Sequence, residues 1–234
     1  MDIIITHIKE IIPYYLIFEC FYYKSKHILP DFNTTYFLLH FIVNIINTIL
    51  LIPLINKIAQ DPTGNYLIHD DWSSLDIIYP MIIGLHPFHL VHNVNKIYYD
   101  EIIHHTLTHI FWYFITFTEN PFYIAGIMAM SGIPGGITYA MLFLQKYNIV
   151  SKLTEKKISM YLNIWCRAPL CIIFATLLYI QGCKNNLFYE TLFMVLFTIV
   201  NGVHFMHNIT QSYYLTNNID NTDNTDIIDT DNKN

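Results

Sequence analysis

Apolar runs separated by short polar connectors organise most of the chain. Each run is close to the roughly 20 residues that an α-helix needs to cross the hydrocarbon core of a bilayer. Such runs fall at about 35–55, 75–94, 103–118, 121–145, 160–181 and 187–208. The pattern predicts an all-α protein, built as a polytopic bundle of transmembrane helices.

The N-terminal segment is a weaker candidate for a span. Lys9, Glu10, Pro13 and Glu19 interrupt its apolar residues, so we expect residues 1–33 to form a weak N-terminal span or a helix lying at the membrane interface. The basic start and small-residue cleavage site of a signal peptide are missing. The bundle should therefore have six to seven spans.

The last 20 residues have a different composition from the rest. Residues 215–234 are acidic and rich in Asn, Asp and Thr, so we expect a disordered tail after a membrane domain at 34–214. Most lysines, including those of the connector at 146–157, fall on one side of the seven-span arrangement. The positive-inside rule then places the C-terminus in the cytosol and the N-terminus in the lumen.

The overall composition supports membrane insertion and argues against other classes. Hydrophobic residues make up 53% of the chain and charged residues 13%, whereas soluble domains carry about 25% charged residues. A net charge of −6 gives no support for nucleic-acid binding. The four cysteines lack the spacing of a zinc site or a disulfide framework.

The stretch DEIIHHTLTH, residues 100–109, places acids and histidines at the start of an apolar run. In a helix, Asp100 lies one turn before His104, Glu101 one turn before His105, and His105 one turn before His109. A carboxylate that accepts a proton from one ring nitrogen makes the other nitrogen a better base. These pairs are candidates for acid–base chemistry, although histidines at an interface also bond to lipid headgroups and water.

Arg167 is the only arginine, and it lies inside the apolar run at 160–181. A charge at that depth is costly unless it has a partner or faces a water-filled cavity. Asn163 lies one turn earlier on the same helix face, and the other interpretation is that Arg167 extends to the cytosolic interface. Arg167 and Asn163 are therefore candidates to bind a lipid headgroup.

Further histidines occur in GLHPFHLVHN and NGVHFMHN. Together with the histidines of residues 104–109, they could form the histidine box of a di-iron oxidase, because imidazole suits iron. Their spacing differs from the usual HxxxH and HxxHH boxes, and a polar seam between helices explains them equally well. We assign no metal ligands. The additional histidines are His86, His89, His92, His204 and His207.

The stretch SGIPGGITY lies in the middle of the run at 121–145. Pro134 removes a backbone hydrogen bond there and is expected to kink the helix. Gly135 and Gly136 favour close packing against another helix.

These features together resemble the TLC-domain family, named after TRAM, the Lag1 ceramide synthases and CLN8. The resemblance covers roughly residues 36–214 and rests first on DEIIHH, an acid followed four residues later by a histidine pair at the start of a span. The N-x-x-x-R of Asn163 and Arg167 adds to it, as does His40 within LLHFIVN.

The resemblance implies a helical bundle around a central, lipid-accessible cavity. His104 and His105 correspond to the pair with which ceramide synthases transfer an acyl group from acyl-CoA to a sphingoid amine, and Asp100 would orient one of them. Acyl-CoA would then be a co-substrate, and no resident cofactor is expected.

The chain departs from the ceramide synthases after the histidine pair. Those enzymes continue with a D-x-x-D stretch ahead of a Glu, whereas NPFYIAGIMAMSGIPGGITYAML contains no acid. We therefore expect a non-synthase member that binds, senses or modifies a membrane lipid in an ER-like endomembrane. An N-acyltransferase and the di-iron oxidase remain as alternatives. The expected headgroup site comprises Arg167, Asn163, Glu101 and His40.

Overall fold

The computed structural model describes residues 2–64, 75–93, 102–103, 105–110, 126–127 and 131–231, and these are helical except for short connections. The predicted all-α class is confirmed over this part of the chain. Asp100, Glu101 and His104 lie outside it. The named helical elements are α1 (Asp2–Ser25), α2 (Phe32–Gln60), α3 (Leu75–Asn93), α6 (Ile133–Lys146), α7 (Lys152–Leu162), η1 (Asn163–Arg167), α8 (Ala168–Lys184) and α9 (Phe188–Asp231).

Within the residues that the structure describes, three helical stretches are long and apolar enough to cross a membrane. They are Phe32–Gln60, Lys152–Lys184 and Thr191–Ile219, which match three of the expected spans. Residues Ile77–His92 of α3 form a shorter apolar helix. Most of the expected span at 103–118 lies outside the described residues.

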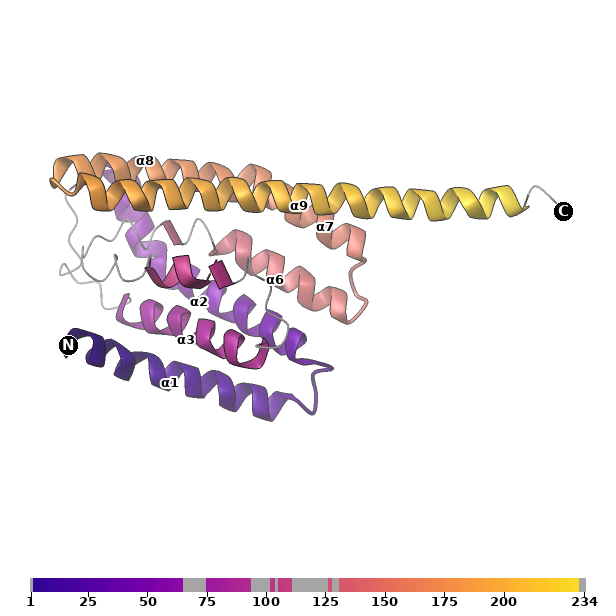
Figure 1. The fold of residues 1–234 in the computed structure, drawn as a ribbon, viewed down its shortest axis with the longest axis horizontal. Coiled ribbons are helices and arrows are strands. Elements are labelled where there is room, and N and C mark those ends of the chain that lie inside the picture. Colours follow the sequence, from indigo (N-terminus) through magenta and orange to yellow (C-terminus); the bar gives the residue numbers. More distant parts are fainter. Residues whose placement is uncertain are drawn as a thin grey trace.

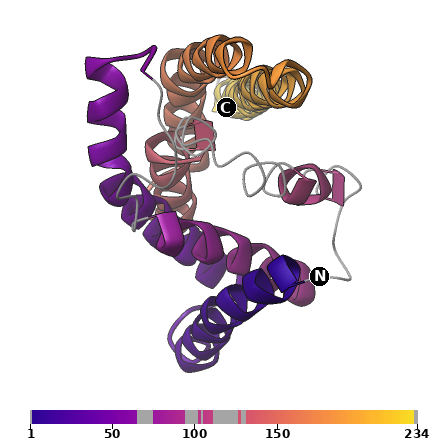
Figure 2. The same cartoon turned by 90° about the vertical axis from the view of Figure 1, so that its left-hand side faces the viewer.

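Helix pairs build the bundle in layers. In Figure 1, α8 and α9 lie side by side along one face, and α1 lies along the opposite face next to α3. Figure 2, which views the molecule from one end, shows the same separation, with α2 connecting the two layers. The α1–α3 and α8–α9 contacts carry much of the apolar core, with Phe88, Ile78, Leu178 and Met194 buried completely or nearly so.

The start of α2 is fixed by Asp31. Its carboxylate accepts hydrogen bonds from the Thr34 backbone N–H at 2.7 Å and from the Thr34 hydroxyl at 2.6 Å. It also pairs with Lys146 Nζ at 3.1 Å, which joins α2 to the end of α6. A side chain of this kind satisfies backbone donors that a helix start leaves without partners.

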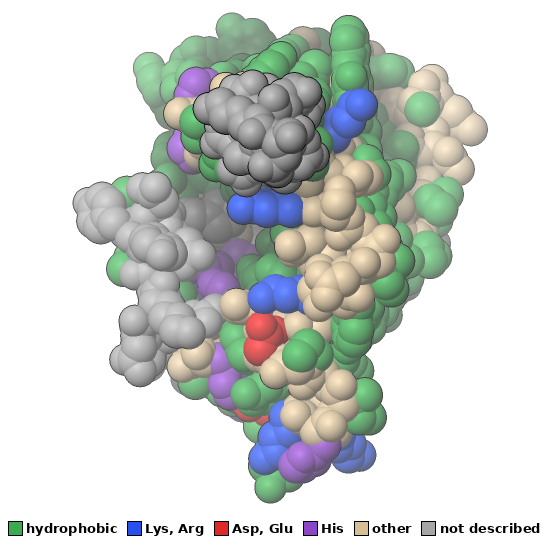
Figure 3. Space-filling view, turned by 90° about the vertical axis from the view of Figure 1, so that its right-hand side faces the viewer, with side chains coloured by type: hydrophobic (Ala, Val, Ile, Leu, Met, Phe, Trp, Pro, Cys, Tyr) green, Lys and Arg blue, Asp and Glu red, His purple; other side chains and the backbone are tan. Residues whose placement is uncertain are grey.

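Charged side chains lie at the end of the bundle that carries both the α1–α2 and the α6–α7 connections (Figures 1 and 3). Lys24 and Lys146 lie in the last turns of α1 and α6. Figure 3 shows this end, with basic groups set among largely hydrophobic flanks. Both connections therefore place lysines on the same side of the bundle.

Pro134 does not kink a helix, so this expectation was wrong. Ser131 and Gly132 form a turn, and α6 begins at Ile133 with the proline in its first turn. The missing N–H of proline has no cost there, because the first N–H groups of a helix lack intrahelical partners. The apolar run at 121–145 is therefore not one continuous helix.

The close packing expected of the glycines is present. A Cβ on Gly136 would lie 3.4 Å from the Asn44 Cβ, and one on Gly135 would lie 3.3 Å from the Asn44 Nδ2. The absence of side chains here lets the first turn of α6 pack directly on α2.

Helix α9 continues further than the sequence pattern predicts. The segment from residue 215 onward was expected to be disordered, yet the helix runs to Asp231 and projects beyond the rest of the bundle in Figure 1. Once a helix has formed, each added residue costs little, because a hydrogen bond accompanies each residue that becomes fixed.

Candidate functional site

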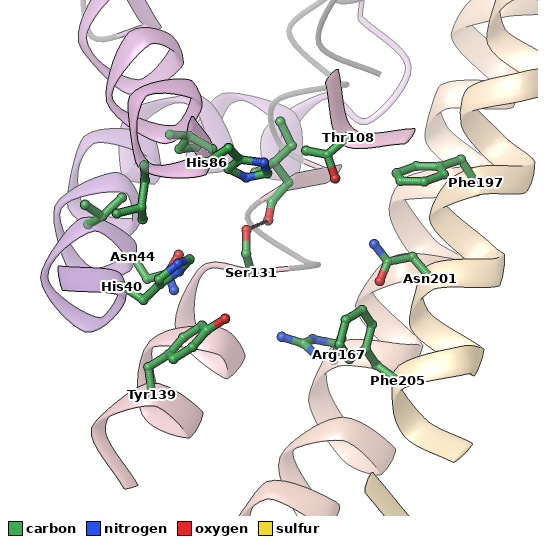
Figure 4. A pocket seen from close by; sticks show the side chains of 14 residues that line it. His40, Asn44, His86, Thr108, Ser131, Tyr139, Arg167, Phe197, Asn201 and Phe205 are labelled. Atoms are coloured by element: carbon green, nitrogen blue, oxygen red, sulfur yellow. Dashed lines mark hydrogen bonds between the residues drawn. The ribbon is translucent and has the colours of Figure 1, made fainter. Parts of the chain in front are cut away.

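A cavity of about 130 Å³ lies between α2, α3, α6, η1 and α9. Figure 4 shows side chains from all these elements converging on it. The helical segment at 105–110 contributes Thr108 to the wall. The polar groups that define its chemistry are His40, Asn44, His86, Tyr139, Arg167 and Asn201.

Arg167 extends into this cavity from the end of η1. Its side chain is only 7% exposed, and its Cζ lies 4.9 Å from the centre of the Phe205 ring. Nη1 donates a hydrogen bond to the Asn163 Oδ1 at 3.2 Å, so the two predicted headgroup residues do lie together. Among the described residues, Nε has no hydrogen-bond partner and no carboxylate forms an ion pair with the guanidinium.

The helix is locally widened where it carries Arg167. Residues Asn163–Arg167 form a π-helical turn between α7 and α8. Such single turns occur frequently at functional sites, because the extra residue turns a side chain away from the regular helix face. Asn163 and Arg167 are both buried here.

A ladder of polar side chains extends from Arg167 toward the start of α7. Asn163 Nδ2 donates to the Ser159 carbonyl at 2.7 Å, and the Ser159 hydroxyl donates to Glu155 Oε1 at 3.0 Å. Glu155 is 2% exposed and has Lys156 Nζ at 3.5 Å from Oε2. The sequence interpretation missed Ser159 and Glu155, although the sequence shows Glu155, Ser159 and Asn163 at successive four-residue intervals.

Asn44 is a second site residue that the sequence interpretation missed. It is 5% exposed, it lines the cavity from α2, and its Nδ2 has no hydrogen-bond partner among the described residues. Its presence inside an apolar run was the available signal, because an amide in a span needs a partner inside the protein.

His105 lies inside the bundle and contacts His86 of α3. The two Nδ1 atoms are 3.1 Å apart and both side chains are buried. A hydrogen bond between two imidazole nitrogens requires one proton between them, so one ring donates and the other accepts. The expected partner of His105 was Glu101. The contact with His86, 19 residues earlier, comes from the packing of separate helices.

His109 has a different role from the one that its spacing suggested. Its Nδ1 donates to the backbone carbonyl of His105 at 2.7 Å. Its ring lies 5.4 Å from that of His86. The ring therefore bonds to the backbone of its own helix one turn earlier, next to the His86–His105 contact.

Tyrosines connect His40 with the other histidines. The His40 ring stacks on Tyr139 with centroids 4.3 Å apart. The Tyr139 and Tyr36 hydroxyl oxygens are 3.4 Å apart, and Tyr36 lies 4.3 Å from the His89 ring. The His89 ring lies 5.2 Å from that of His105. His40 thus lies in the cavity wall among aromatic neighbours that the sequence did not identify, and its role as a headgroup ligand stays a prediction.

Two further histidines in the described residues have polar partners outside this group. His92 Nε2 lies 3.0 Å from Glu19 Oε1, and His204 Nε2 lies 2.9 Å from Asn208 Nδ2. In the described parts of the chain, no group of three His, Cys, Asp or Glu side chains is arranged to hold a metal ion.

A second, more apolar pocket adjoins the cavity. It has a volume of about 260 Å³ and lies between Ile103 and Leu107 on one side and α9 on the other. Phe197, Asn201 and Phe205 line both spaces. The polar cavity and the apolar pocket therefore share a wall along α9.

Searches for relatives add no information about this site. No protein-family model, curated protein or solved structure matched the chain. The resemblance to the TLC-domain family remains a prediction from the motifs.

Proposed function

We propose that this chain is a multi-pass membrane protein of the TLC type that binds, senses or modifies a membrane lipid in the cavity around Arg167. The observation that carries the proposal is the buried Arg167 guanidinium, which faces a cavity without an ion-pair partner among the described residues. An arginine at membrane depth is costly unless it serves a ligand or a polar pathway.

The surroundings of the cavity support a lipid as the ligand. The polar cavity adjoins an apolar pocket, as a molecule with a polar head and an apolar chain requires. The lysines at the α1–α2 and α6–α7 end support a cytosolic orientation of that end. We also propose that the chain crosses the membrane six to seven times, with its N-terminus in the lumen and its C-terminus in the cytosol. The membrane would be an ER-like endomembrane.

Lipid analysis of the purified protein tests the proposal. The full chain is purified in a mild detergent, and its bound lipids are extracted and identified by mass spectrometry. We expect about one lipid for each wild-type chain and a strong loss in Arg167→Gln. Lys24→Gln is the matched control, since it removes a positive charge from an exposed position on α1. A wild-type protein that carries no lipid would refute the proposal.

An acyltransferase is the second candidate function, and the His86–His105 contact favours it. A proton held between the two Nδ1 atoms fixes the ring tautomers, which a general base requires. In the proposed reaction, the base takes a proton from an amine, the amine nitrogen bonds to the acyl carbon, and the thiolate of CoA leaves with that proton. Acyl-CoA is the donor and a sphingoid amine is the acceptor to be tried first. With a lysolipid, the base would take the proton of a hydroxyl group instead, and its oxygen would bond to the acyl carbon.

The transferase is tested by product formation from labelled acyl-CoA. We expect His105→Asn to abolish activity. His86→Asn should lower kcat and shift the pH profile, because His86 acts through His105. His207→Asn is the control on exposed α9. Absence of product from wild type with every acceptor removes this candidate and leaves the binding function. The histidine-box oxidase gains no support from a described contact, and elemental analysis for iron would test it.

A further inference from the structure

The polar cavity has an excess of hydrogen-bond donors and of positive charge. Arg167 contributes a guanidinium that is always charged. No Asp or Glu belongs to the described lining of the cavity. Two buried donors, the Arg167 Nε and the Asn44 Nδ2, have no partner among the described residues. Buried donors without partners are costly, so a ligand with acceptor atoms is the expected complement.

The two donor side chains flank one small space. A Cβ on Gly135 would lie 3.3 Å from the Asn44 Nδ2 and 3.5 Å from the Arg167 Nη2. Because residue 135 is a glycine, no side chain of its own occupies this position. An oxygen atom placed nearby could accept hydrogen bonds from both groups.

The start of α6 lies beside the same space. Ser131, just before the helix, lines the cavity. Gly132 caps the helix without a side-chain hydrogen bond. The N-terminus of a helix carries a partial positive charge and favours anions. Arg167, Asn44 and the first turn of α6 therefore favour the same kind of ligand.

We propose that the cavity binds the singly charged anionic head of an acidic lipid, either a phosphodiester or a carboxylate, and that one acyl chain of this lipid lies in the adjoining apolar pocket. A single negative charge neutralises the one arginine of the chain. This inference rests on the proposed lipid function and names the class of lipid.

The path of the acyl chain follows from the shared wall. Phe197, Asn201 and Phe205 face both spaces. Beyond them, the apolar pocket is lined by Val200 of α9, whose side chain is 62% exposed. A chain attached to a head at Arg167 passes these side chains and continues into the surrounding bilayer.

Binding of defined lipids to the purified full chain tests the head-group preference. The probes are dioleoyl-phosphatidylglycerol and oleate as anionic lipids, dioleoyl-phosphatidylcholine as a zwitterionic lipid, and inorganic phosphate and acetate as heads without chains. Native mass spectrometry and equilibrium dialysis measure the bound fraction. We expect the anionic lipids to bind about tenfold more tightly than phosphatidylcholine. The phosphodiester of phosphatidylcholine is attached to a choline cation, which would have to lie near the Arg167 guanidinium in a cavity whose described lining has no carboxylate.

Variants separate the head site from the chain site. Arg167→Gln should weaken anionic lipids about tenfold. It should change phosphatidylcholine much less, because removing the guanidinium takes away both the attraction to the phosphate and the repulsion of the choline. Val200→Trp should fill the apolar pocket and weaken all lipids, whereas Val203→Trp makes the same change on α9 outside the lining of the pocket. Both valines are exposed, so these two variants should fold even if Arg167→Gln does not.

Each outcome distinguishes this inference from the lipid function itself. If phosphatidylcholine binds as tightly as the anionic lipids, the cavity holds lipid but the inferred head-group class is wrong. If phosphate or acetate binds as tightly as the lipids, or if Val200→Trp behaves like Val203→Trp, the inferred path of the chain is wrong. If no lipid binds to wild type, both proposals fail.

Discussion

The contact between Gly202 of α9 and Cys171 of α8 sets the distance between these helices at the level of the cavity. Gly202 follows Asn201, which lines the cavity, and Cys171 lies one turn after Arg167. A Cβ on Gly202 would lie 2.8 Å from the Cys171 Cβ and 3.1 Å from its Sγ. Non-bonded carbon atoms pack at about 3.5–4.0 Å, so Gly202→Ala requires the helices to separate by about 1 Å.

The expected cost follows from two opposing effects. Overpacking of this kind costs about 1–3 kcal/mol, and alanine regains about 1 kcal/mol over glycine in helix propensity. The 2.8 Å contact is short enough to place the overpacking cost in the upper half of this range, at about 2–3 kcal/mol. We therefore expect Gly202→Ala to lower the free energy of unfolding by about 1–2 kcal/mol. The unfolding temperature should fall by about 2–4 °C for each kcal/mol. Binding of the anionic lipid should weaken as well, because the cavity wall moves.

The assay is thermal unfolding of the purified chain in detergent, with lipid binding measured in parallel. Gly126→Ala is the matched control, since the nearest atom to its Cβ would be the Leu178 Cδ1 at an ordinary 4.0 Å. Cys171→Gly removes the Cβ and Sγ atoms that would collide with an alanine at position 202. In a double-mutant cycle, Cys171→Gly and Gly202→Ala should therefore show a coupling energy of about 1 kcal/mol or more. An unchanged unfolding temperature in Gly202→Ala, or additive effects in the cycle, would refute the reasoning.

Two further predictions concern the ends of α2. Partial burial acts to raise the pKa of the Asp31 carboxyl, but hydrogen bonds from Thr34 and Lys146 outweigh it and hold this pKa below its ordinary value. A carboxylate of this kind stabilises the fold above its unfolded-state pKa and ceases to do so as the pH falls through its folded-state pKa. Asp31→Ala should therefore lower the free energy of unfolding by about 1 kcal/mol at pH 7, mainly because the helix cap is lost. In strong acid the same substitution should have little effect, and thermal unfolding measured at both pH values would show the difference. At the other end of α2, Gln181 Nε2 donates a hydrogen bond to the Gly64 carbonyl at 2.6 Å. Gln181→Leu should therefore lower the free energy of unfolding by about 1–2 kcal/mol and make the 61–64 connection more susceptible to proteolysis. Equal cleavage of wild type and variant would contradict this prediction.

The sequence alone determined those features that depend on one helix at a time. The apolar runs predicted helices at α2, at α7–α8 and at α9, because bilayer thickness fixes the length of a span. The pairing of Asn163 with Arg167 followed from their four-residue spacing, since the helical repeat places such residues on one face. The same rule would have found Ser159 and Glu155.

Other features depended on the tertiary structure. The His86–His105 contact, the position of Asn44 opposite Gly135, and the tyrosines around His40 all join residues from different helices. A helix that is apolar on every side carries little information about which face turns inward, because lipid and protein interior are similarly apolar environments. The rotation and pairing of the helices, and with them the shape and charge of the cavity, are set by close contacts between small residues and by polar groups that find partners only when the helices have assembled.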